Sequence, residues 1–469
     1  MLKQLILENW KSFRYAELPL DPLTVLIGTN ASGKSNVVEA LEFLQRIARG
    51  ENIEAALAGD KILPSIRGGV EWAALKPETQ FTLKALIQGE NENTDYLYSI
   101  TVQTKPITQI LMEDIIEPQE EINKNNNKQD FDKKYISNKS LLPIIKKELV
   151  TSNELKNEIN QTKNHINSEF TKIIDNSSLL KSLNDSEIEI LKKFANGESL
   201  IASTNQNIQL IEDVKSRLIE HFNNREKEID SLINPLLKEY EFVVNRLENI
   251  FVVNPIPSKM RDYSLISDVF ESDASNIAGV LTALPDERKA EVEATLSAYV
   301  KNLPEGDIRK VFAEPVGRLK TDAMLYCEEE WKPGEIKLID ATTISDGTLR
   351  FIAILTALLT RPEGSQLVIE EIDNGLHPSR AELLVRILRE IGSKRKIDIL
   401  ITTHNPALLD ALGPEIVPFV VVAHRDKETG ESKLTLLEDI ENLPLLLASG
   451  TLGKLATKGA IEKSLSDNK

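Results

Sequence analysis

The stretch Leu23–Ser35 reads LTVLIGTNASGKS and carries the strongest local pattern in the chain. Its first five residues are typical of a buried strand, and the residues after it have the apolar spacing of a helix. Between them lies G-x-x-x-x-G-K-[ST], which in a strand–loop–helix context predicts a phosphate-binding loop. The alternative is a glycine-rich turn before an ordinary helix, but the strand and helix on either side favour the phosphate loop.

Each residue type in this loop suits the chemistry of a nucleoside triphosphate. Gly28 and Gly33 let the backbone approach closely, so that amide N–H groups and a helix N-terminus can face the phosphates. Lys34 supplies a positive charge, and Ser35 supplies a hydroxyl ligand for Mg²⁺. The expected cofactors are therefore ATP and Mg²⁺, and the expected nucleotide-binding residues of the loop are Gly28, Asn30, Ala31, Ser32, Gly33, Lys34, Ser35 and Asn36.

A pair of carboxylates follows a second predicted strand. The run QLVIEE begins at Gln366 and ends in Glu370 and Glu371. Successive strand residues face opposite ways, so we expect Glu370 to hold Mg²⁺ and Glu371 to polarise the attacking water. Two acids after an apolar run could also be a solvated strand end. The phosphate loop upstream favours the catalytic interpretation.

Two further motifs complete the predicted site. His404 follows a predicted strand at residues 397–401, where it could reach the γ-phosphate from the carboxyl edge of a sheet. A lone histidine is more often structural. Ser345, Gly347 and Thr348 precede an apolar helix at residues 351–359. Such a turn could present amides and a hydroxyl to an anion, although helix capping is the simpler interpretation of these residues alone.

The middle of the chain is predicted to be helical. Gly197 is the only glycine between Gly89 and Gly279, and both glycine and proline are scarce where long helices form. The spacing predicts an antiparallel, coiled-coil-like arm over residues 116–252, with a compact helical subdomain as the open alternative. The apolar residues that carry this prediction recur at spacings of three, four or seven: Ile211, Val214, Leu218, Phe222, Ile229, Leu232, Leu236, Tyr240, Val243, Leu247 and Ile250.

Both flanks of this region alternate short β-rich runs with helical spacing. The runs LTVLIG, SQLVIEEID, KIDILITTH and IVPFVVVAH are each separated from the next by helical or turn residues. This alternation is typical of an α/β fold with a largely parallel sheet. We therefore predict one α/β domain in two lobes, residues 1–115 and residues 253–469, split by the helical insertion.

Composition limits the classes of function. The 469 residues include 56 basic and 73 acidic side chains, a net charge of −17, which argues against a protein that coats DNA with its whole surface. A local basic patch such as Lys394–Lys396 remains possible, although a solvated loop is the simpler interpretation. The single cysteine, Cys327, excludes a disulfide framework and a CxxC zinc site. Without a signal peptide or a long apolar run, a soluble cytoplasmic protein with no membrane partner is expected.

Together the motifs resemble the nucleotide-binding domain of the ABC superfamily. The opening Asn9–Phe13 (NWKSF) is similar to the start of the branch that holds the structural-maintenance-of-chromosomes (SMC) proteins, RecF and the overcoming-lysogenization-defect (OLD) ATPases. Three further runs resemble, more narrowly, standalone prokaryotic OLD-like ATPases that are often linked to phage defence. These runs are Asn254–Tyr263, SDGTLR from Ser345 and IDNGLHPSR from Ile372.

The resemblance implies an active site shared between two copies of the chain. In that family the signature motif of one protomer caps the γ-phosphate held by another, so Ser345, Gly347 and Thr348 would act in trans within an ATP-bridged homodimer. Residues 373–377 fall where the family has its dimer-contact loop. Lys11 and Ser12 fall near where this branch contacts nucleotide.

The sequence also departs from the family pattern. Glu370 stands where most members have Asp, Asp346 stands at a signature position that is usually small, and Ile372 replaces a usual Pro. The family's glutamine loop has only one weak candidate, Gln80. These departures predict slow hydrolysis rather than loss of ATP binding, as in a clamp or sensor.

Two functions remain after others are excluded. A transport ATPase would have no use for the predicted arm, and no motif suggests the acceptor pocket of a metabolic kinase. The chain could be the ATPase of an anti-phage system that controls a separately encoded effector, such as a TOPRIM- or HNH-type nuclease, because no nuclease motif follows His404. Alternatively it could be a RecF-like DNA repair ATPase that binds DNA.

Overall fold

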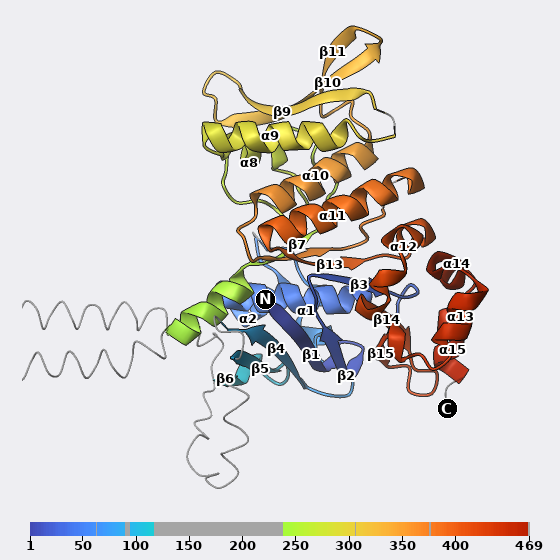
Figure 1. Cartoon of the computed structure of the whole chain (residues 1–469). Helices are drawn as coiled ribbons and strands as arrows, with labels where there is room; N and C mark the ends of the chain where they lie inside the picture. The colour runs from blue at the N-terminus through green and yellow to red at the C-terminus, as the bar shows by residue number, and fades with distance from the viewer. Residues whose placement is uncertain (62, 90–93, 117–237, 305, 375–376, 468–469) are drawn as a thin grey trace, which may run out of the picture. The chain divides into compact units, whose positions relative to one another are not determined.

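The computed structural model describes residues 1–61, 63–89, 94–116, 238–304, 306–374 and 377–467 (Figure 1). The chain forms two compact units, one of Met1–Ser140 with Val243–Lys469 and one of Leu141–Phe242. Nearly all of the predicted arm, residues 116–252, lies outside the described residues, so the helical hairpin stays a prediction. The first unit holds all the elements below.

A six-stranded sheet forms the centre of this unit, in the order β15-β14-β3-β13-β12-β7. All neighbours are parallel except the antiparallel pair β14–β15. The early strand β3 pairs with two late strands, β13 and β14, so both lobes build one sheet and the α/β prediction is confirmed. The strands are β3 (Leu23–Ile27), β7 (Ile250–Val253), β12 (Gln366–Ile369), β13 (Asp398–Thr402), β14 (Val420–Arg425) and β15 (Ser432–Leu436).

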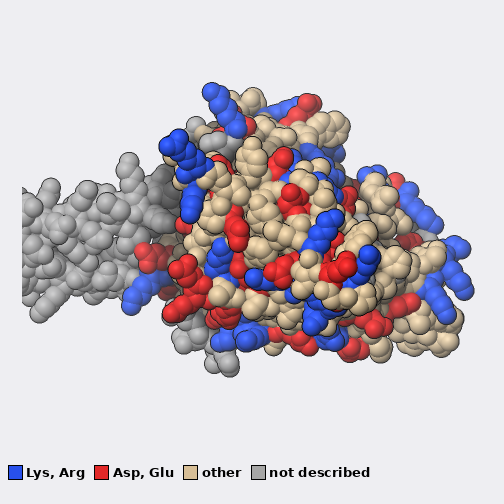
Figure 2. Space-filling view, turned by 90° about the horizontal axis from the view of Figure 1, so that it is seen from above, with Lys and Arg blue, Asp and Glu red and all other residues tan. Residues whose placement is uncertain are grey.

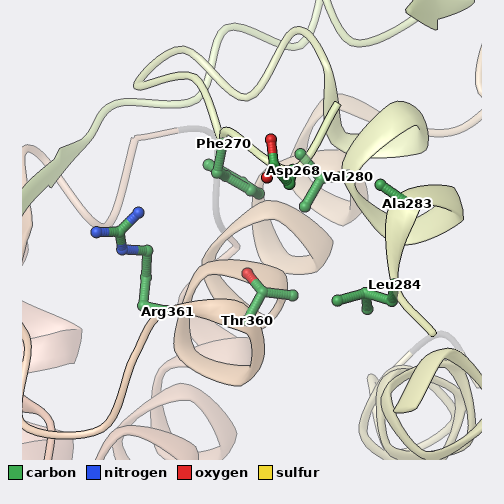
Figure 3. Close-up of a pocket in the computed structure, with 7 residues that line it drawn as sticks. All are labelled: Asp268, Phe270, Val280, Ala283, Leu284, Thr360 and Arg361. Carbon is green, nitrogen blue, oxygen red and sulfur yellow. The ribbon is translucent and has the colours of Figure 1, made fainter. Parts of the chain in front are cut away.

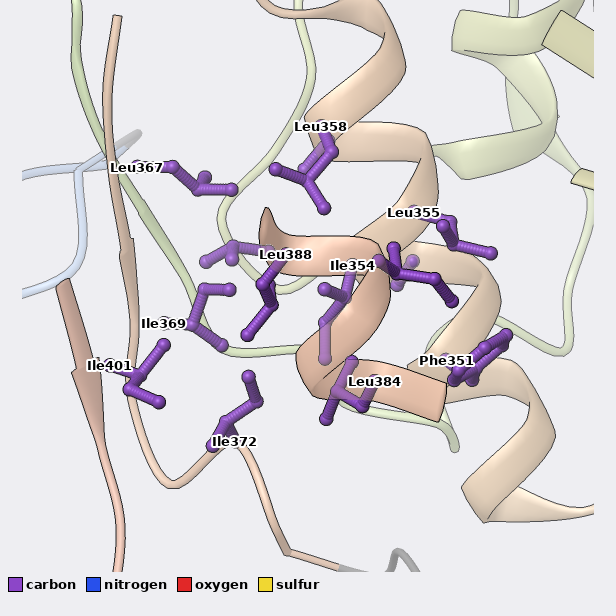
Figure 4. Packing of buried hydrophobic residues seen from close by; sticks show 14 of the residues in the cluster. Phe351, Ile354, Leu355, Leu358, Leu367, Ile369, Ile372, Leu384, Leu388 and Ile401 are labelled. Carbon is purple, nitrogen blue, oxygen red and sulfur yellow. The ribbon is translucent and has the colours of Figure 1, made fainter. Parts of the chain in front are cut away.

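Apolar helices bury this sheet. Helix α10 (Asp346–Thr360) and helix α11 (Ala381–Arg395) lie side by side (Figure 1), and Leu355, Leu367 and Leu384 belong to one buried apolar cluster (Figure 4). Helix α1 (Lys34–Ala48) begins directly after the phosphate loop. Because strands covered in this way are apolar at successive positions, as in β12, the short hydrophobic runs identified in the sequence match the strands.

Leu355→Ala should test this core. Leu355 is completely buried, so its truncation is expected to lower the free energy of unfolding by about 2–5 kcal/mol. Urea denaturation would measure the change. Leu445→Ala is the matched control, because Leu445 is 73% exposed and its loss should cost less than about 0.5 kcal/mol. Equal losses in the two variants would contradict the packing described here.

The N-terminal lobe also forms an antiparallel sheet, which corrects the prediction of largely parallel pairing. Its order is β2-β1-β4-β5-β6. In β4 buried and partly exposed residues alternate, as in a sheet with one covered face, and Trp10, Phe43 and Phe81 pack together beneath it. The strands are β1 (Leu2–Trp10), β2 (Phe13–Pro19), β4 (Gln80–Gln88), β5 (Asp95–Gln103) and β6 (Gln109–Ile116).

A third sheet, absent from the sequence-based prediction, precedes the signature motif. Helices α8 (Ile277–Ala283) and α9 (Asp286–Val300) pack against it (Figure 1). Cys327 lies in its buried face, where burial raises the pKa of the thiol to about 12, so this cysteine is a core residue. The strands are β8 (Ser264–Leu265), β9 (Ile308–Val316), β10 (Asp322–Lys332) and β11 (Glu335–Asp340).

The boundary between the predicted helical arm and the C-terminal lobe, expected between residues 252 and 253, lies earlier in the structure. The helix ends at residue 248, and β7 already begins at Ile250. All four residues of β7 are buried, and Ile250 happens to continue the helical spacing of the residues before it. A helical seam and a buried strand are both apolar, so their junction is not visible in the pattern.

Short helices complete the unit, and none of the helices within the described ranges is long and apolar enough to cross a membrane. They are α2 (Ile53–Ala58), η1 (Val70–Trp72), η3 (Pro378–Arg380), α12 (Pro406–Leu412), η4 (Pro414–Phe419), η5 (Leu437–Asp439), α13 (Leu443–Ser449), α14 (Leu452–Thr457) and α15 (Ala460–Asp467).

Candidate nucleotide-binding site

Three of the predicted motifs meet at one edge of the central sheet. The phosphate loop follows β3, the acidic pair follows β12, and His404 follows β13. These strands are parallel neighbours in the order β3-β13-β12, so their carboxyl ends share an edge. Ligands of open α/β sheets bind at such an edge.

The phosphate loop is shaped by glycines that no other residue could replace without strain. Gly28 and Gly33 have φ values of 146° and 114°. A Cβ added to Gly28 would lie 2.2 Å from the Ala423 carbonyl oxygen, and one added to Gly33 would lie 2.7 Å from the Phe13 ring. The loop is therefore wrapped tightly between β14 and β2, with its backbone close to the start of α1.

Gly33→Ala should test the shape of the loop. Its new methyl group would clash with Phe13, so we expect nucleotide affinity to fall at least about tenfold, because small displacements of a binding group are costly. Gly334→Ala is the control: Gly334 also has a positive φ, 83°, but nothing lies within 4 Å of its added Cβ. Backbone strain alone should cost the Gly334→Ala protein about 1 kcal/mol of stability, and the Gly33→Ala protein should lose more because of the clash. Unchanged affinity of the Gly33→Ala protein in a nucleotide titration would contradict the assignment.

Lys34 lies against the loop that it is expected to serve. Its Nζ donates to the carbonyl oxygens of Gly28 at 2.5 Å and Thr29 at 3.1 Å. Burial lowers the pKa of the Lys34 ammonium, and the negative charges of Glu371, Asp373 and Glu370 oppose that shift. The lysine is thus placed between the loop carbonyls and the acidic residues that follow β12.

Ser35 and Glu370 supply a plausible pair of magnesium ligands. The Ser35 hydroxyl donates to the Glu370 carboxylate, although the two residues are far apart in the sequence. Nearby, the Ser32 hydroxyl is buried and has no hydrogen-bond partner among the described residues. Mg²⁺ is usually held by one or two protein oxygens together with substrate phosphates and water, and this pair fits that need. Within the described ranges, no group of three or more His, Cys, Asp or Glu side chains could hold a metal alone.

Glu371 lies beside Glu370 but in a different environment. It has a positive φ of 47°, and its backbone N–H donates to the Thr402 hydroxyl at 2.8 Å. The side chain is exposed, unlike that of Glu370. The turn therefore directs one carboxylate to the phosphate loop and leaves the other open to water, while the catalytic roles of the two residues stay predictions.

His404 lies beside the acidic turn, to which its neighbour Thr403 is joined by a buried hydrogen bond. The Thr403 hydroxyl donates to Asp373 Oδ1 at 2.5 Å, and the other Asp373 oxygen lies 3.9 Å from His404 Nδ1. The histidine side chain is 58% exposed, so it is free to approach a ligand. Thr402 and Thr403 were not identified from the sequence, because a threonine at the end of a strand carries no distinctive signal.

The signature motif forms a helix cap in the described structure. The Ser345 hydroxyl accepts from the Thr348 backbone N–H at 3.2 Å, which matches the capping interpretation. Arg380 donates to the Thr348 hydroxyl at 3.3 Å. Gly347 is buried in the first turn of α10. Binding of a nucleotide by these residues remains a prediction.

Lys11 and Ser12 lie beside the phosphate loop and already have partners. Ser12 Oγ accepts from Asn36 Nδ2 at 2.7 Å, which places it next to the start of α1. Lys11 pairs with Glu39 on α1 and donates to the Arg67 carbonyl oxygen at 2.9 Å. Nucleotide contacts of Lys11 and Ser12 stay predictions. The weak glutamine-loop candidate, Gln80, is the exposed first residue of β4.

Arg67 is a site residue that the sequence did not reveal. Its guanidinium lies 3.7 Å from Glu370 and 3.5 Å from Glu39, and the side chain is 71% exposed. It belongs to an irregular stretch between α2 and η1, where no periodicity or motif marks it. Arg67 therefore places a positive charge beside the carboxylate expected to hold Mg²⁺.

In the basic run at residues 394–396, Arg395 is partly buried, while Lys394 and Lys396 are exposed. Lys394 and Arg395 end α11, and Lys396 caps it in the left-handed conformation, so the run is not a free loop. Arg395 donates to the carbonyl oxygens of Leu358 and Arg361 at 2.6 and 2.8 Å. In the face shown in Figure 2, basic and acidic side chains are interspersed.

A small pocket of about 70 Å³ lies away from these motifs, between α8 and the end of α10 (Figure 3). The Arg361 guanidinium packs over the Phe251 ring at 4.6 Å, and burial lowers the pKa of Arg361 to about 10. No predicted site residue lines this pocket. Its lining residues are Asp268, Phe270, Val280, Ala283, Leu284, Thr360 and Arg361.

Three solved SMC head domains are similar to this chain, each at 12% sequence identity. The one from Pyrococcus furiosus, bound to the C-terminal domain of ScpA, has a TM-score of 0.41, and the match covers 95% of this chain and 99% of that one. The one from Thermotoga maritima has a TM-score of 0.39 and coverages of 93% and 98%, and the one from Pyrococcus yayanosii has a TM-score of 0.41 and coverages of 99% and 99%. No curated protein matches the sequence. Residues 23–410, which run from the start of β3 past His404, match one family across most of the chain. The chain therefore belongs to the family described as "AAA domain, putative AbiEii toxin, Type IV TA system".

Proposed function

We propose that the protein binds ATP with Mg²⁺ and hydrolyses it slowly, as an SMC- and OLD-like ATPase that dimerises around the nucleotide. The observation that carries this proposal is the meeting of Lys34, the Ser35–Glu370 pair and Glu371 at one sheet edge. Family membership across residues 23–410 supports it.

Each residue has one task in the proposed reaction. The loop amides and Lys34 would hold the phosphates, while Ser35 and Glu370 would hold Mg²⁺, which would supply charge neutralisation at the phosphates. Glu371 accepts a proton from water as the water oxygen bonds to the γ-phosphorus and the bond to the leaving ADP oxygen breaks. His404 orients the γ-phosphate from the neighbouring strand end. Glu370 stands where the resembling family usually has Asp, and this difference is expected to slow turnover.

ATP-driven dimerisation can be tested by mass. A Glu371→Gln protein, which should hold ATP without cleaving it, is expected to change from monomer to dimer when ATP and Mg²⁺ are added and to stay monomeric with ADP. Light scattering coupled to gel filtration would measure the mass. Adding Ser345→Arg should prevent the dimer while leaving ATP binding intact, because Ser345 belongs to the expected partner-facing motif. A mass that does not respond to ATP would contradict the dimer.

We further propose that the dimer acts in the cytoplasm and controls a separately encoded effector, such as a TOPRIM- or HNH-type nuclease, in anti-phage defence. The family description names a putative toxin of a type IV toxin–antitoxin system, which supports the defence context but not a particular effector. The net charge of −17 favours a protein partner over extensive DNA contact. Purification together with the products of neighbouring genes, with and without ATP, would test this proposal. Replication or recombination neighbours and direct DNA binding would favour the RecF-like alternative.

A further inference from the structure

Arg261 forms several hydrogen bonds with the loop that leads into the signature motif. One of its terminal nitrogens, Nη1, donates to the carbonyl oxygens of Ala341 at 3.0 Å, Thr342 at 2.9 Å and Ile344 at 2.7 Å. The other, Nη2, pairs with the carboxylate of Asp346. The Arg261 side chain is only 27% exposed. One guanidinium thus fixes the path of the chain from the end of β11 to the first turn of α10.

This set of hydrogen bonds depends on the shape of the arginine side chain. A guanidinium is planar and carries five N–H donors, so it can bind several carbonyl oxygens and a carboxylate at once. A lysine ammonium could neutralise the carboxylate but could not hold both sides of the contact in the same geometry. Ser345 lies directly between the bound Ile344 carbonyl and the bound Asp346 carboxylate.

The contact also explains the unusual Asp346. An acidic side chain in the first turn of a helix is favourable for the helix itself. It would nevertheless repel an incoming phosphate, and the Asp346 side chain is 67% exposed. Arg261 neutralises this carboxylate by forming an ion pair with it. The negative charge of Asp346 also attracts Arg350, one turn further along α10.

The segment that carries Arg261 reaches the acidic pair at its other end. The Val253 carbonyl oxygen, at the end of β7, accepts from the Glu370 backbone N–H at 3.4 Å. Eight residues later, Arg261 holds the signature loop. The short stretch from Val253 to Arg261 therefore connects the magnesium-binding turn with the signature motif of the same chain.

We propose that Arg261 is a positioning residue for ATP hydrolysis that acts in trans: it shapes the signature loop and cancels the charge of Asp346, so that the loop can accept the γ-phosphate held by a second copy. This inference rests on the proposed ATP-bridged dimer. In that dimer the segment 253–261 would link the two nucleotide sites, because one end touches the site of its own chain and the other end serves the partner's site.

Complementation between two inactive variants tests this role. Arg261→Ala is expected to reduce ATP turnover about 10²-fold through misplacement of the loop, with ATP binding to the single protomer unchanged. The Lys34→Ala protein lacks the phosphate loop function but keeps an intact signature. Co-expressed with different tags and purified through both in buffers that contain ATP and Mg²⁺, the mixed dimer should contain one complete site, formed by the Lys34 of one copy and the Arg261 of the other. Its turnover should return to roughly half that of the wild-type dimer, since one of two equivalent sites is intact.

The possible outcomes are distinct. A mixed dimer as inactive as its parents would overturn the proposal, because Arg261 would then serve the phosphate loop of its own chain. Wild-type turnover in the Arg261→Ala protein would also overturn it. ATP hydrolysis by the Lys34→Ala protein alone, or failure of the Glu371→Gln protein to dimerise with ATP, would instead refute the proposed function itself.

Two further variants distinguish the effect of the Arg261 contacts from a general loss of folding. Lys259→Ala is the control, because Lys259 lies on the same segment but pairs with Asp273 at 2.8 Å and is 57% exposed, so turnover should not change. Arg261→Lys keeps the charge opposite Asp346 and should be less impaired than Arg261→Ala, and it allows the complementation to be repeated if the alanine variant unfolds. Thermal melting of each protein would show which variants are folded. An Arg261→Lys protein with a wild-type melt that is not rescued by the Lys34→Ala partner would overturn the proposal.

Discussion

Replacement of Lys34 with alanine is expected to abolish ATP binding and, with it, every ATP-dependent change in mass. The Lys34 ammonium is the cation of the phosphate loop and lies among Glu371, Asp373 and Glu370. Without it, the triphosphate would meet these carboxylates with no lysine to offset their charge. We expect the affinity to fall by at least about 10²-fold, because charge-assisted hydrogen bonds to a phosphate are among the strongest in proteins. Fluorescent-nucleotide titration or calorimetry would measure the change.

The control for this variant removes a positive charge elsewhere. Lys427 is exposed in the turn between β14 and β15, so Lys427→Ala should bind ATP as tightly as the wild type. Both proteins should melt at similar temperatures, since the hydrogen bonds of the Lys34 ammonium go to the nearby Gly28 and Thr29 carbonyl oxygens of the loop. If the Lys34→Ala protein retained wild-type affinity, the phosphate-loop assignment would be wrong.

Glu371→Gln should separate binding from hydrolysis. The substitution keeps the size of the side chain and the backbone bond to Thr402, but an amide cannot accept the proton of the attacking water. ATP affinity is expected to stay near the wild-type value, while turnover falls by about 10²-fold or more. Single-turnover phosphate release would measure the chemical step without interference from product dissociation.

Glu363→Gln offers a matched comparison for this substitution. Glu363 is exposed just before β12, at the opposite end of the strand from the acidic pair, so its change should leave turnover unaltered. Turnover of the Glu371→Gln protein equal to the wild type would show that Glu371 is not the base. The next candidate would then be His404, which is exposed at the neighbouring strand end.

The features predicted correctly are those set by short stretches of chain. The strand, loop and helix around Gly28–Ser35 follow from local composition, and the acid pair follows an apolar run that could hardly be anything but a buried strand. Parallel pairing then places their carboxyl ends together, so the meeting of Lys34 with Glu370 could be predicted without coordinates.

The features that were missed depend on contacts between distant residues. Nothing near Arg67 in the sequence indicates that it faces Glu370, and nothing near Arg261 indicates that it binds a loop 80 residues later. The antiparallel sheet of the N-terminal lobe was missed for a different reason. Few helices separate its strands, and this favours antiparallel pairing. The parallel pairing expected around the phosphate loop does not apply to the rest of the lobe.

The position of β3 between β13 and β14 has a consequence for how the protein is made. During synthesis β3 emerges early, while both strands that flank it are translated only near the end of the chain. At ordinary rates of translation this leaves the strand without its neighbours for a time on the order of tens of seconds. The open edges and apolar faces of the nascent first lobe must be protected through that interval, so a ribosome-associated chaperone is expected to determine the yield of folded protein.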